Sequence, residues 1–201
     1  MVRKIFVVIC YIIAHCFYRV RTEGYENIPK EGAAIICGNH VHLFDAISFV
    51  VHLKKRMIYV MAKAELFESK FGNWLFTHVG AFPVARGKGD VAAVNTAIHH
   101  LEQGDLLLIF PEGTRNGLAK GQKFKKGAAY MAIQNKVPIV PIAFAGSFKF
   151  MHKVLVRVGK PIDVTPYLSD NGEVDVKKVI ELTKVVQDEV IKLRDEKVTL
   201  G

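Results

Sequence analysis

Short apolar runs alternate with amphipathic stretches along most of the chain. Apolar runs bounded by glycine, proline or charged residues are typical of buried strands. We expect such strands at 33–37, 57–62, 80–86, 105–110, 138–145 and 153–158. Apolar residues that recur on one side of a helix predict helices at 46–51, 66–79, 91–103, 127–136 and 174–197. The alternation predicts an α/β fold: a single domain with a mixed, mostly parallel central sheet flanked by helices.

Finer patterns predict where some of these segments lie. Proline lacks the N–H that a sheet ladder uses, so Pro83 and Pro141 predict that their strands lie at an edge or bend. The segment 153–158 alternates charged and apolar residues at its ends and predicts a half-exposed strand. Residues 22–32 are mostly polar, which indicates a connector.

Residues 5–17 are almost uninterruptedly apolar and aromatic, with basic residues on both sides. The segment is short for a bilayer span of about 20 residues, and no small-residue cleavage site follows it. A buried core helix would also fit, but basic flanks and aromatic residues are typical of a helix in the membrane interface. We therefore expect a membrane-associated helix in 1–21 and an α/β domain in 22–201; whether the helix spans or lies in the bilayer stays open.

Charge and cysteine content narrow the class of protein. With 28 basic and 19 acidic residues, the net charge of +9 indicates an anionic partner: nucleic acid, anionic lipid, or an acidic protein or substrate. Basic residues with interleaved aromatic ones on one face are missing, and nucleic-acid binding would leave the hydrophobic start unexplained. The three cysteines form no CxxC pair, so we expect neither disulfides nor a zinc site, and we favour a reducing location that faces the cytosol.

The first predicted strand ends in a segment that could carry acid–base chemistry. His40 can accept a proton at neutral pH, because free imidazole has a pKa of about 6.5. A carboxylate at Asp45 can fix its tautomer and stabilise the imidazolium. Residues five apart do not share a helix face, so the two meet only if His40 lies in a turn and Asp45 in the first helical turn. A purely local hydrogen bond is the alternative.

Polar residues also follow the other predicted strands. Because the carboxyl ends of parallel strands meet at one edge of a sheet, we expect these residues to converge on one crevice. They are His40, Asp45, Lys63, Arg86, Glu112 and Arg115. A planar guanidinium can bind a phosphate with two hydrogen bonds. A base and several cations in one cleft suit acyl or phosphoryl transfer to a phosphorylated alcohol.

Two further interpretations are open at the same segment. His42 and Asp45 could join His40 as metal ligands, although no fourth ligand is in view. Cys37, three residues before His40, could be a nucleophile, or a small hydrophobic residue in a buried strand.

Four ordered segments together resemble the conserved blocks of the glycerolipid acyltransferase family. They are Asn39-His40-x4-Asp45, Gly-x-Phe-Pro-Val-x-Arg at 80–86, Phe-Pro-Glu-Gly-Thr-Arg at 110–115, and Val-Pro-Ile-Val-Pro at 137–141. Within that family the chain is similar to the bacterial enzymes that acylate 1-acyl-glycerol 3-phosphate. One departure is that larger members have a longer, two-helix N-terminal membrane motif, whereas this sequence has room for one hydrophobic helix.

The resemblance implies roles for individual residues. His40 would be the general base, oriented by Asp45, and Pro141 would belong to the acyl-donor side. The implied substrate-binding residues are Lys63, Arg86, Glu112, Gly113, Thr114 and Arg115, with the two arginines on the substrate phosphate. The family needs no metal or other cofactor and forms no acyl-enzyme, which argues against a metal at His42 and a nucleophilic Cys37.

The resemblance also implies a reaction. An acyl group would pass from acyl carrier protein or coenzyme A to the 2-hydroxyl of 1-acyl-glycerol 3-phosphate (lysophosphatidate), which gives phosphatidic acid for phospholipid biosynthesis. The enzyme would work at the cytoplasmic face of the cell membrane, on anionic lipid. Two alternatives are another acceptor, such as glycerol 3-phosphate, another lysophospholipid or a lyso-aminolipid, and a non-catalytic membrane-binding module.

Overall fold

The computed structural model describes residues 2–17, 19–42, 44–53, 56–85, 89–146, 152–170 and 172–196. Its helices are α1 (Val2–Phe17), α2 (Asp45–Val50), α3 (Lys70–His78), α4 (Val91–Glu102), α5 (Gly127–Asn135) and α6 (Val176–Asp195). Its strands are β1 (Arg19–Glu23), β2 (Ala34–Gly38), β3 (Ile58–Lys63), β4 (Ala81–Val84), β5 (Leu106–Ile109), β6 (Ile139–Gly146) and β7 (Lys153–Val158).

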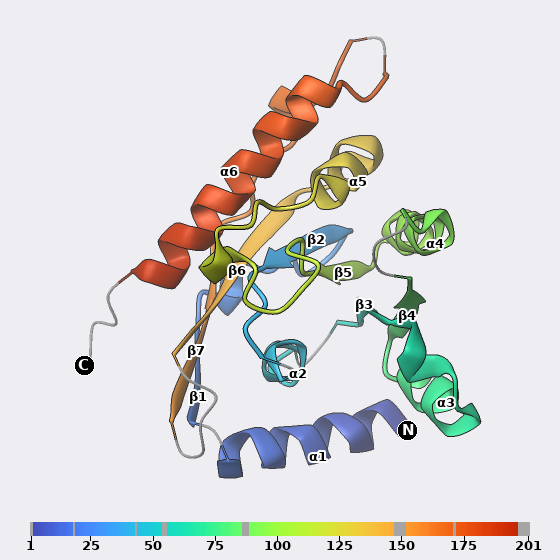
Figure 1. Ribbon diagram of the computed structural model, residues 1–201, viewed down its shortest axis with the longest axis vertical. Coiled ribbons are helices and arrows are strands. Elements are labelled where there is room, and N and C mark those ends of the chain that lie inside the picture. Colours follow the sequence, from blue (N-terminus) through green and yellow to red (C-terminus); the bar gives the residue numbers. More distant parts are fainter. Residues whose placement is uncertain are drawn as a thin grey trace.

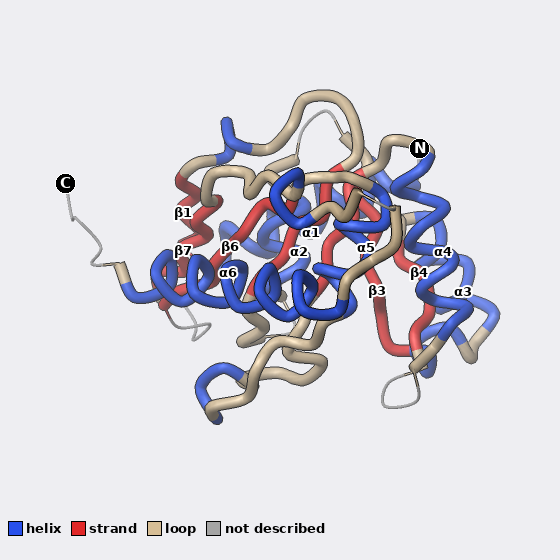
Figure 2. The backbone as a smooth tube through the Cα atoms, turned by 90° about the horizontal axis from the view of Figure 1, so that it is seen from above, coloured by secondary structure: helices blue, strands red, loops and turns tan. Residues whose placement is uncertain are grey.

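The described strands form one sheet in the order β1-β7-β6-β2-β5-β3-β4. The five strands from β6 to β4 are mutually parallel, β7 is antiparallel to β6, and β1 is parallel to β7. Viewed from above, β1 and β7 lie at one edge and β3 and β4 at the other (Figure 2). The prediction of a mixed, mostly parallel sheet is therefore confirmed.

Helices cover both faces of the sheet, which explains the continuous apolar runs in its central strands. Every residue of β2 and β5 is buried. One face packs against α4, α5 and α6, and the other packs against α2 (Figure 1). Helix α1 packs against α2 on that second side. The core thus consists of two apolar layers that hold the central strands and their carboxyl ends rigidly.

The edge formed by β1 and β7 differs from the prediction. Residues 19–23 form β1, which pairs with β7 so that Arg19 lies opposite Lys153. The connector predicted at 22–32 is therefore wrong for its first two residues. Strand β1 also runs across the domain boundary placed at residue 21. Strand β7 is buried except at Lys153, because β1 and β6 flank it and helices cover it; its predicted half exposure is wrong.

The two strand prolines have different positions. Pro83 lies in the edge strand β4, as predicted. Pro141 lies in the interior strand β6, so an edge position is wrong for it. The hydrogen bonds toward the β7 side are made at Ile139 and resume from Ile142. Pro141 lies between these two sets of hydrogen bonds, and its carbonyl accepts the N–H of Gly159 at 2.8 Å. The N–H that proline lacks therefore removes little from the hydrogen bonding of the sheet.

Helix α1 presents an apolar face to solvent. Cys10 is buried, whereas Ile5, Val8, Ile9 and Ile12 are each about half exposed or more. The helix has 16 residues. Within the described part of the chain, no helix has the length and apolar content that crossing a membrane requires.

Candidate active site

His40 and Asp45 meet as the spacing argument required. His40 lies in the loop after β2, and Asp45 is the first residue of α2. Nδ1 of His40 lies 2.9 Å from Oδ2 of Asp45. The same oxygen accepts the backbone N–H groups of Val41 at 2.6 Å and His42 at 2.8 Å, so the carboxylate also shapes the loop. Because Nδ1 is engaged, Nε2 of His40 is the nitrogen left to accept a proton from a substrate.

The environment of this pair restricts the imidazole. The Asp45 side chain is fully buried, and that of His40 is 12% exposed. The ring of Phe110 stacks on His40, with the centroids 4.4 Å apart. Ring stacking and a buried carboxylate together fix the orientation of the imidazole before any substrate arrives.

Two buried polar side chains fix the histidine loop to the sheet. Asn39 forms two hydrogen bonds with the backbone of Phe144 in β6, at 2.8 and 3.0 Å. Glu112 accepts the N–H of His40 at 2.6 Å and the N–H of Leu118 at 2.7 Å. Both side chains are at least 97% buried, since their exposed fractions are 2% and 3%. Glu112 therefore acts on the position of His40, a role that its place in the third block alone did not reveal.

A cavity of about 390 Å³ adjoins His40, within the range of small-molecule sites. Its polar wall includes His40, Gly113 and Lys125. Its apolar wall includes Met61 of β3, Val84 of β4, Val94 of α4, Ile109 of β5 and Met131 of α5. The ends of β2, β3, β4 and β5 thus meet at one crevice, as predicted, but of the described polar residues expected there His40 alone lies on the cavity wall.

The predicted substrate-binding residues are distributed unevenly around this cavity. Gly113 forms part of its wall, with a positive φ of 69°. Thr114 and Arg115 are exposed on the loop after β5, and Thr114 Oγ1 lies 3.3 Å from Gln122 Oε1. Lys63 is exposed at the end of β3 in an ion pair with Glu65 at 2.8 Å. Neither Lys63 nor Arg115 belongs to the cavity wall.

Arg86 lies outside the described residues. The described residues before and after it, Ala85 and Asp90, are joined by a hydrogen bond and line the cavity. Asp90 caps α4 by accepting the N–H of Ala93 at 3.0 Å, and it accepts the N–H of Ala85 at 2.7 Å. The hydrogen bond from Ala85 lowers the pKa of the Asp90 carboxyl most, and the bond from Ala93 lowers it further. Ala85, Gly89 and Asp90 all line the cavity.

Lys125 is the cavity residue that the sequence did not single out. Its N–H donates to the carbonyl of Pro111 at 2.9 Å, which holds it beside the third-block turn. Its ammonium lies so close to Gly113 that a Cβ at that glycine would be 2.6 Å from Nζ. The sequence showed only a basic glycine- and lysine-rich loop, in which no pattern distinguished one lysine from the others.

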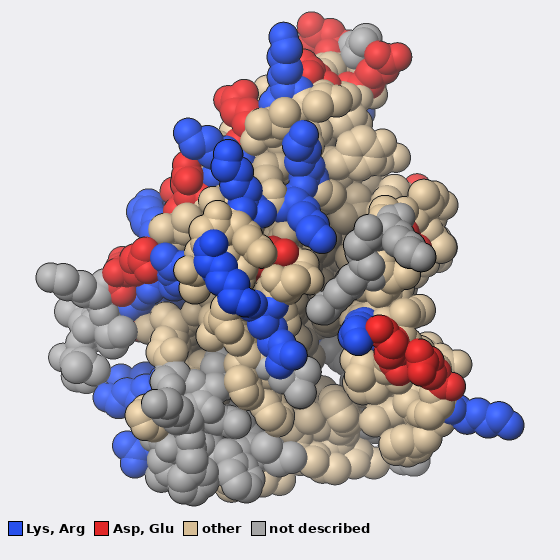
Figure 3. All heavy atoms as spheres, in the orientation of Figure 1, with Lys and Arg blue, Asp and Glu red and all other residues tan. Residues whose placement is uncertain are grey.

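The loop after β5 carries a concentration of positive charge. Its exposed cations are Arg115, Lys120, Lys123, Lys125 and Lys126. Figure 3 shows Lys and Arg side chains gathered over this loop on one face of the molecule. The cavity therefore opens beside a surface that attracts anions.

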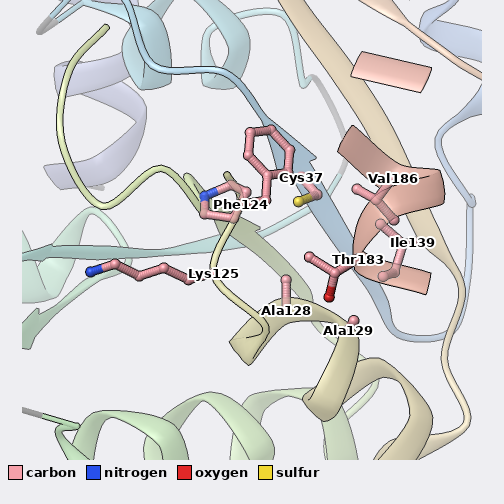
Figure 4. Close-up of a pocket in the computed structure, with 9 residues that line it drawn as sticks. Cys37, Phe124, Lys125, Ala128, Ala129, Ile139, Thr183 and Val186 are labelled. Carbon is pink, nitrogen blue, oxygen red and sulfur yellow. The ribbon is translucent and has the colours of Figure 1, made fainter. Parts of the chain in front are cut away.

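Cys37 is not part of the wall of the cavity beside His40. Its side chain is fully buried beside a cavity of only about 10 Å³, among Phe124, Ala128 and Val186, while Lys125 extends away from that cavity (Figure 4). Burial raises the pKa of the Cys37 thiol well above its usual range. Because the thiolate is the reactive form, this cysteine is not an activated nucleophile.

We expect Cys37→Ala to keep its catalytic activity within about twofold, and to lose about 1 kcal/mol of unfolding free energy through the buried atoms removed. The measurements are kcat and a denaturant unfolding curve. Loss of activity in a variant that remains folded would restore the nucleophile interpretation.

His42 does not share the position of His40. Its Nδ1 accepts the N–H of Phe44 at 3.3 Å, and its ring stacks on that of Phe44. Among the residues described, no three His, Cys, Asp or Glu side chains are grouped closely enough to hold a metal ion.

The sequence matches a known protein family. An acyltransferase family model matches residues 19–145, more than half of the chain. The chain belongs to the acyltransferase family. The matched region includes the histidine loop, the cavity strands and the third-block turn, so the family predicted from the four blocks is confirmed.

Two relatives of known name are similar in sequence to this acyltransferase. It is 33% identical over 127 residues to a 1-acyl-sn-glycerol-3-phosphate acyltransferase of Bacillus subtilis, a match that covers 63% of each chain. It is 30% identical over 182 residues to the enzyme of that name from Borreliella burgdorferi, over 87% of this chain and 71% of the relative.

A solved structure extends the likeness to nearly the whole chain. The crystal structure of the 1-acyl-sn-glycerophosphate acyltransferase PlsC from Thermotoga maritima aligns with a TM-score of 0.71 and 25% identity. The alignment covers 98% of this chain and 82% of that structure.

Proposed function

We propose that this acyltransferase transfers a fatty acyl group from an acyl thioester to the 2-hydroxyl of 1-acyl-glycerol 3-phosphate, which gives phosphatidic acid. The observation that carries the proposal is the His40–Asp45 pair, whose histidine lies on the wall of a cavity of about 390 Å³. The names of the relatives from Bacillus, Borreliella and Thermotoga support this choice of acceptor.

The mechanism uses His40 as a general base. Nε2 takes the proton of the 2-hydroxyl as its oxygen attacks the thioester carbonyl, and Asp45 stabilises the imidazolium that forms. The new C–O bond forms and the C–S bond breaks. The imidazolium then returns the proton to the leaving thiolate, so the enzyme ends unchanged.

The phosphate of the acceptor requires cations near the base. Lys125 supplies one on the cavity wall, and Arg115 lies on the same basic loop. We retain Arg86 and Lys63 as further phosphate ligands, and Glu112 as the residue that positions the His40 loop. Binding the phosphate orients the hydroxyl toward Nε2, which lowers the entropic part of the barrier.

The apolar wall of the cavity suits a fatty acyl chain. Met61, Val94 and Met131 present hydrocarbon and thioether groups rather than hydrogen-bonding groups. A cavity with a polar end at His40 and an apolar wall matches an amphiphilic substrate whose reacting atoms lie near the headgroup.

The same proposal includes attachment to the cytoplasmic face of the cell membrane as a peripheral or monotopic protein. Helix α1 exposes Ile5, Val8, Ile9 and Ile12, and its sequence begins with Arg3 and Lys4. An apolar helix face next to basic residues favours the interface of a membrane that contains anionic lipid.

The test is acyl transfer from labelled acyl-acyl carrier protein and acyl-coenzyme A to lysophosphatidate in detergent. We expect labelled phosphatidic acid, and much lower transfer to glycerol 3-phosphate and to a lyso-aminolipid. Preference for one of those acceptors would replace lysophosphatidate in the proposal. No transfer to any acceptor would favour the non-catalytic membrane module.

Lys125→Gln is expected to raise the KM for lysophosphatidate about tenfold while it changes kcat less. The reason is that the variant loses a charge-assisted hydrogen bond, worth about 1.5–3 kcal/mol, to the substrate phosphate. Steady-state kinetics in both substrates would measure this effect. The matched control is Lys126→Gln, the adjacent exposed lysine, which is not part of the cavity wall. An equal rise in KM for both variants would mean that Lys125 has no specific contact with the phosphate.

A further inference from the structure

We propose that α3 is a second membrane-contact element, which inserts Phe71 and Trp74 into the lipid interface alongside α1. This inference rests on the proposed function, because an enzyme whose acceptor and product are phospholipids must reach them in a bilayer. It adds a surface that the hydrophobic N-terminal segment did not indicate.

The face of α3 is unusually apolar for a solvent-exposed helix. Phe71 is 69% exposed and Trp74 is 46% exposed, and Leu66 just before the helix is 41% exposed. The rings of Phe71 and Trp74 lie 6.1 Å apart, and those of Trp74 and His78 lie 5.0 Å apart. Residues 71, 74 and 78 are spaced by three and four, so these rings form one stripe along the helix.

Helix α3 packs on the short 3-10 helix that precedes it (Ala64–Phe67) and on β4, so the stripe is not an unfolded end. Ser69 caps α3 by accepting the N–H of Gly72 at 2.9 Å. Gly72 is buried, and a Cβ there would lie 2.4 Å from the carbonyl oxygen of Leu66. The rings of Phe67 and Phe76 pack together at 5.7 Å on the inner side. Phe71 and Trp74 are therefore held outward by a packed base.

Charge and position favour a bilayer over a charged protein partner. Residues 63–78 contain two lysines and two glutamates, Lys63, Lys70, Glu65 and Glu68, so the region has no net charge. An acidic acyl carrier protein would find no excess of cations there. Figure 1 shows α3 and α1 at the same end of the long axis of the molecule. Tryptophan is enriched where apolar chains meet headgroups.

The chain contains a single tryptophan, so Trp74 itself reports the environment of this face. The full chain would be titrated with phosphatidylcholine vesicles, with and without phosphatidylglycerol, while tryptophan emission is recorded. We expect a blue shift with both vesicle types, quenching by lipids with brominated acyl chains, and protection from acrylamide. Binding to vesicles with unshifted Trp74 emission would mean that α1 alone makes the contact and would overturn the proposal.

Phe71→Ser tests the surface without removing the probe. We expect it to weaken vesicle binding about tenfold, because it removes an aromatic side chain from the lipid interface. The matched control is Val176→Ser, a 62% exposed apolar residue at the start of α6, which should leave vesicle binding unchanged. Equal vesicle affinity of Phe71→Ser and the unmodified chain would contradict the proposal.

Two controls separate this proposal from its rivals and from the proposed function. A blue shift that grows with protein concentration in the absence of lipid would mean that this face binds a second copy of the chain. A blue shift with acyl carrier protein alone would mean that it binds the acyl donor. Either result would overturn the proposal that α3 contacts a bilayer. Phe71→Ser should keep full activity on detergent-dispersed lysophosphatidate and have lower activity on vesicles when lipid is limiting. If Trp74 shifts but no acyl transfer occurs in any assay, the membrane surface stands and the proposed function fails.

Discussion

His40→Gln is expected to lower kcat for acyl transfer by about 10²–10⁴, the usual contribution of a positioned general base. Glutamine can still donate a hydrogen bond to Asp45, so the buried carboxylate keeps a partner and the loop keeps its shape. The amide cannot accept a proton at neutral pH, which removes the base from the reaction. The measurement is kcat with saturating thioester.

The same substitution two residues away is the matched control. His42→Gln should retain activity within a fewfold, because His42 stacks on Phe44 and is not part of the cavity wall. If His40→Gln were fully active, or if His42→Gln were inactive while His40→Gln was active, a residue other than His40 would have to be the base.

Glu112→Gln is expected to lower the unfolding free energy by about 1.5–3 kcal/mol and kcat by at least about tenfold. The buried carboxylate accepts two N–H groups, from His40 and Leu118. A glutamine would turn an NH₂ group toward one of these donors and leave it unsatisfied. Gly117 packs closely against this carboxylate, since a Cβ there would lie 2.7 Å from Oε2 of Glu112.

Denaturant unfolding and kcat would be measured together, with Glu102→Gln, an exposed glutamate at the end of α4, as the control. Glu102→Gln should leave both quantities unchanged. If Glu112→Gln were as stable and as active as the unmodified protein, Glu112 would not position the His40 loop.

The sequence determined the features that depend on neighbouring residues. The apolar runs of β2 and β5 are buried on both faces, as their composition required. The spacing between His40 and Asp45 restricted the pair to a turn followed by a helix start, and this is the observed arrangement. Pro83 excluded a central strand, and β4 is at the edge. In each case the physical cause lies within a few residues of chain.

The tertiary structure decided the features whose partners lie far away in the sequence. Residues 19–23 become a strand only because β7, more than a hundred residues later, offers its edge. Arg157 is buried although it is charged, because Glu23 and the carbonyls of Leu193 and Glu196 at the end of α6 satisfy its guanidinium. Such pairings depend on the order of strands in space, which local patterns do not specify.

The candidate site divides in the same way. The His40–Asp45 pair could be predicted because its members are five residues apart, whereas its support comes from distant segments: Phe144 bonds Asn39, and Glu112 bonds His40. Lys125 is chemically like the other lysines of its loop, and only its contact with the Gly113 turn brings it to the cavity. The local sequence thus indicated the proposed base, and long-range packing decided which residues hold it and which cation lies on the same cavity wall.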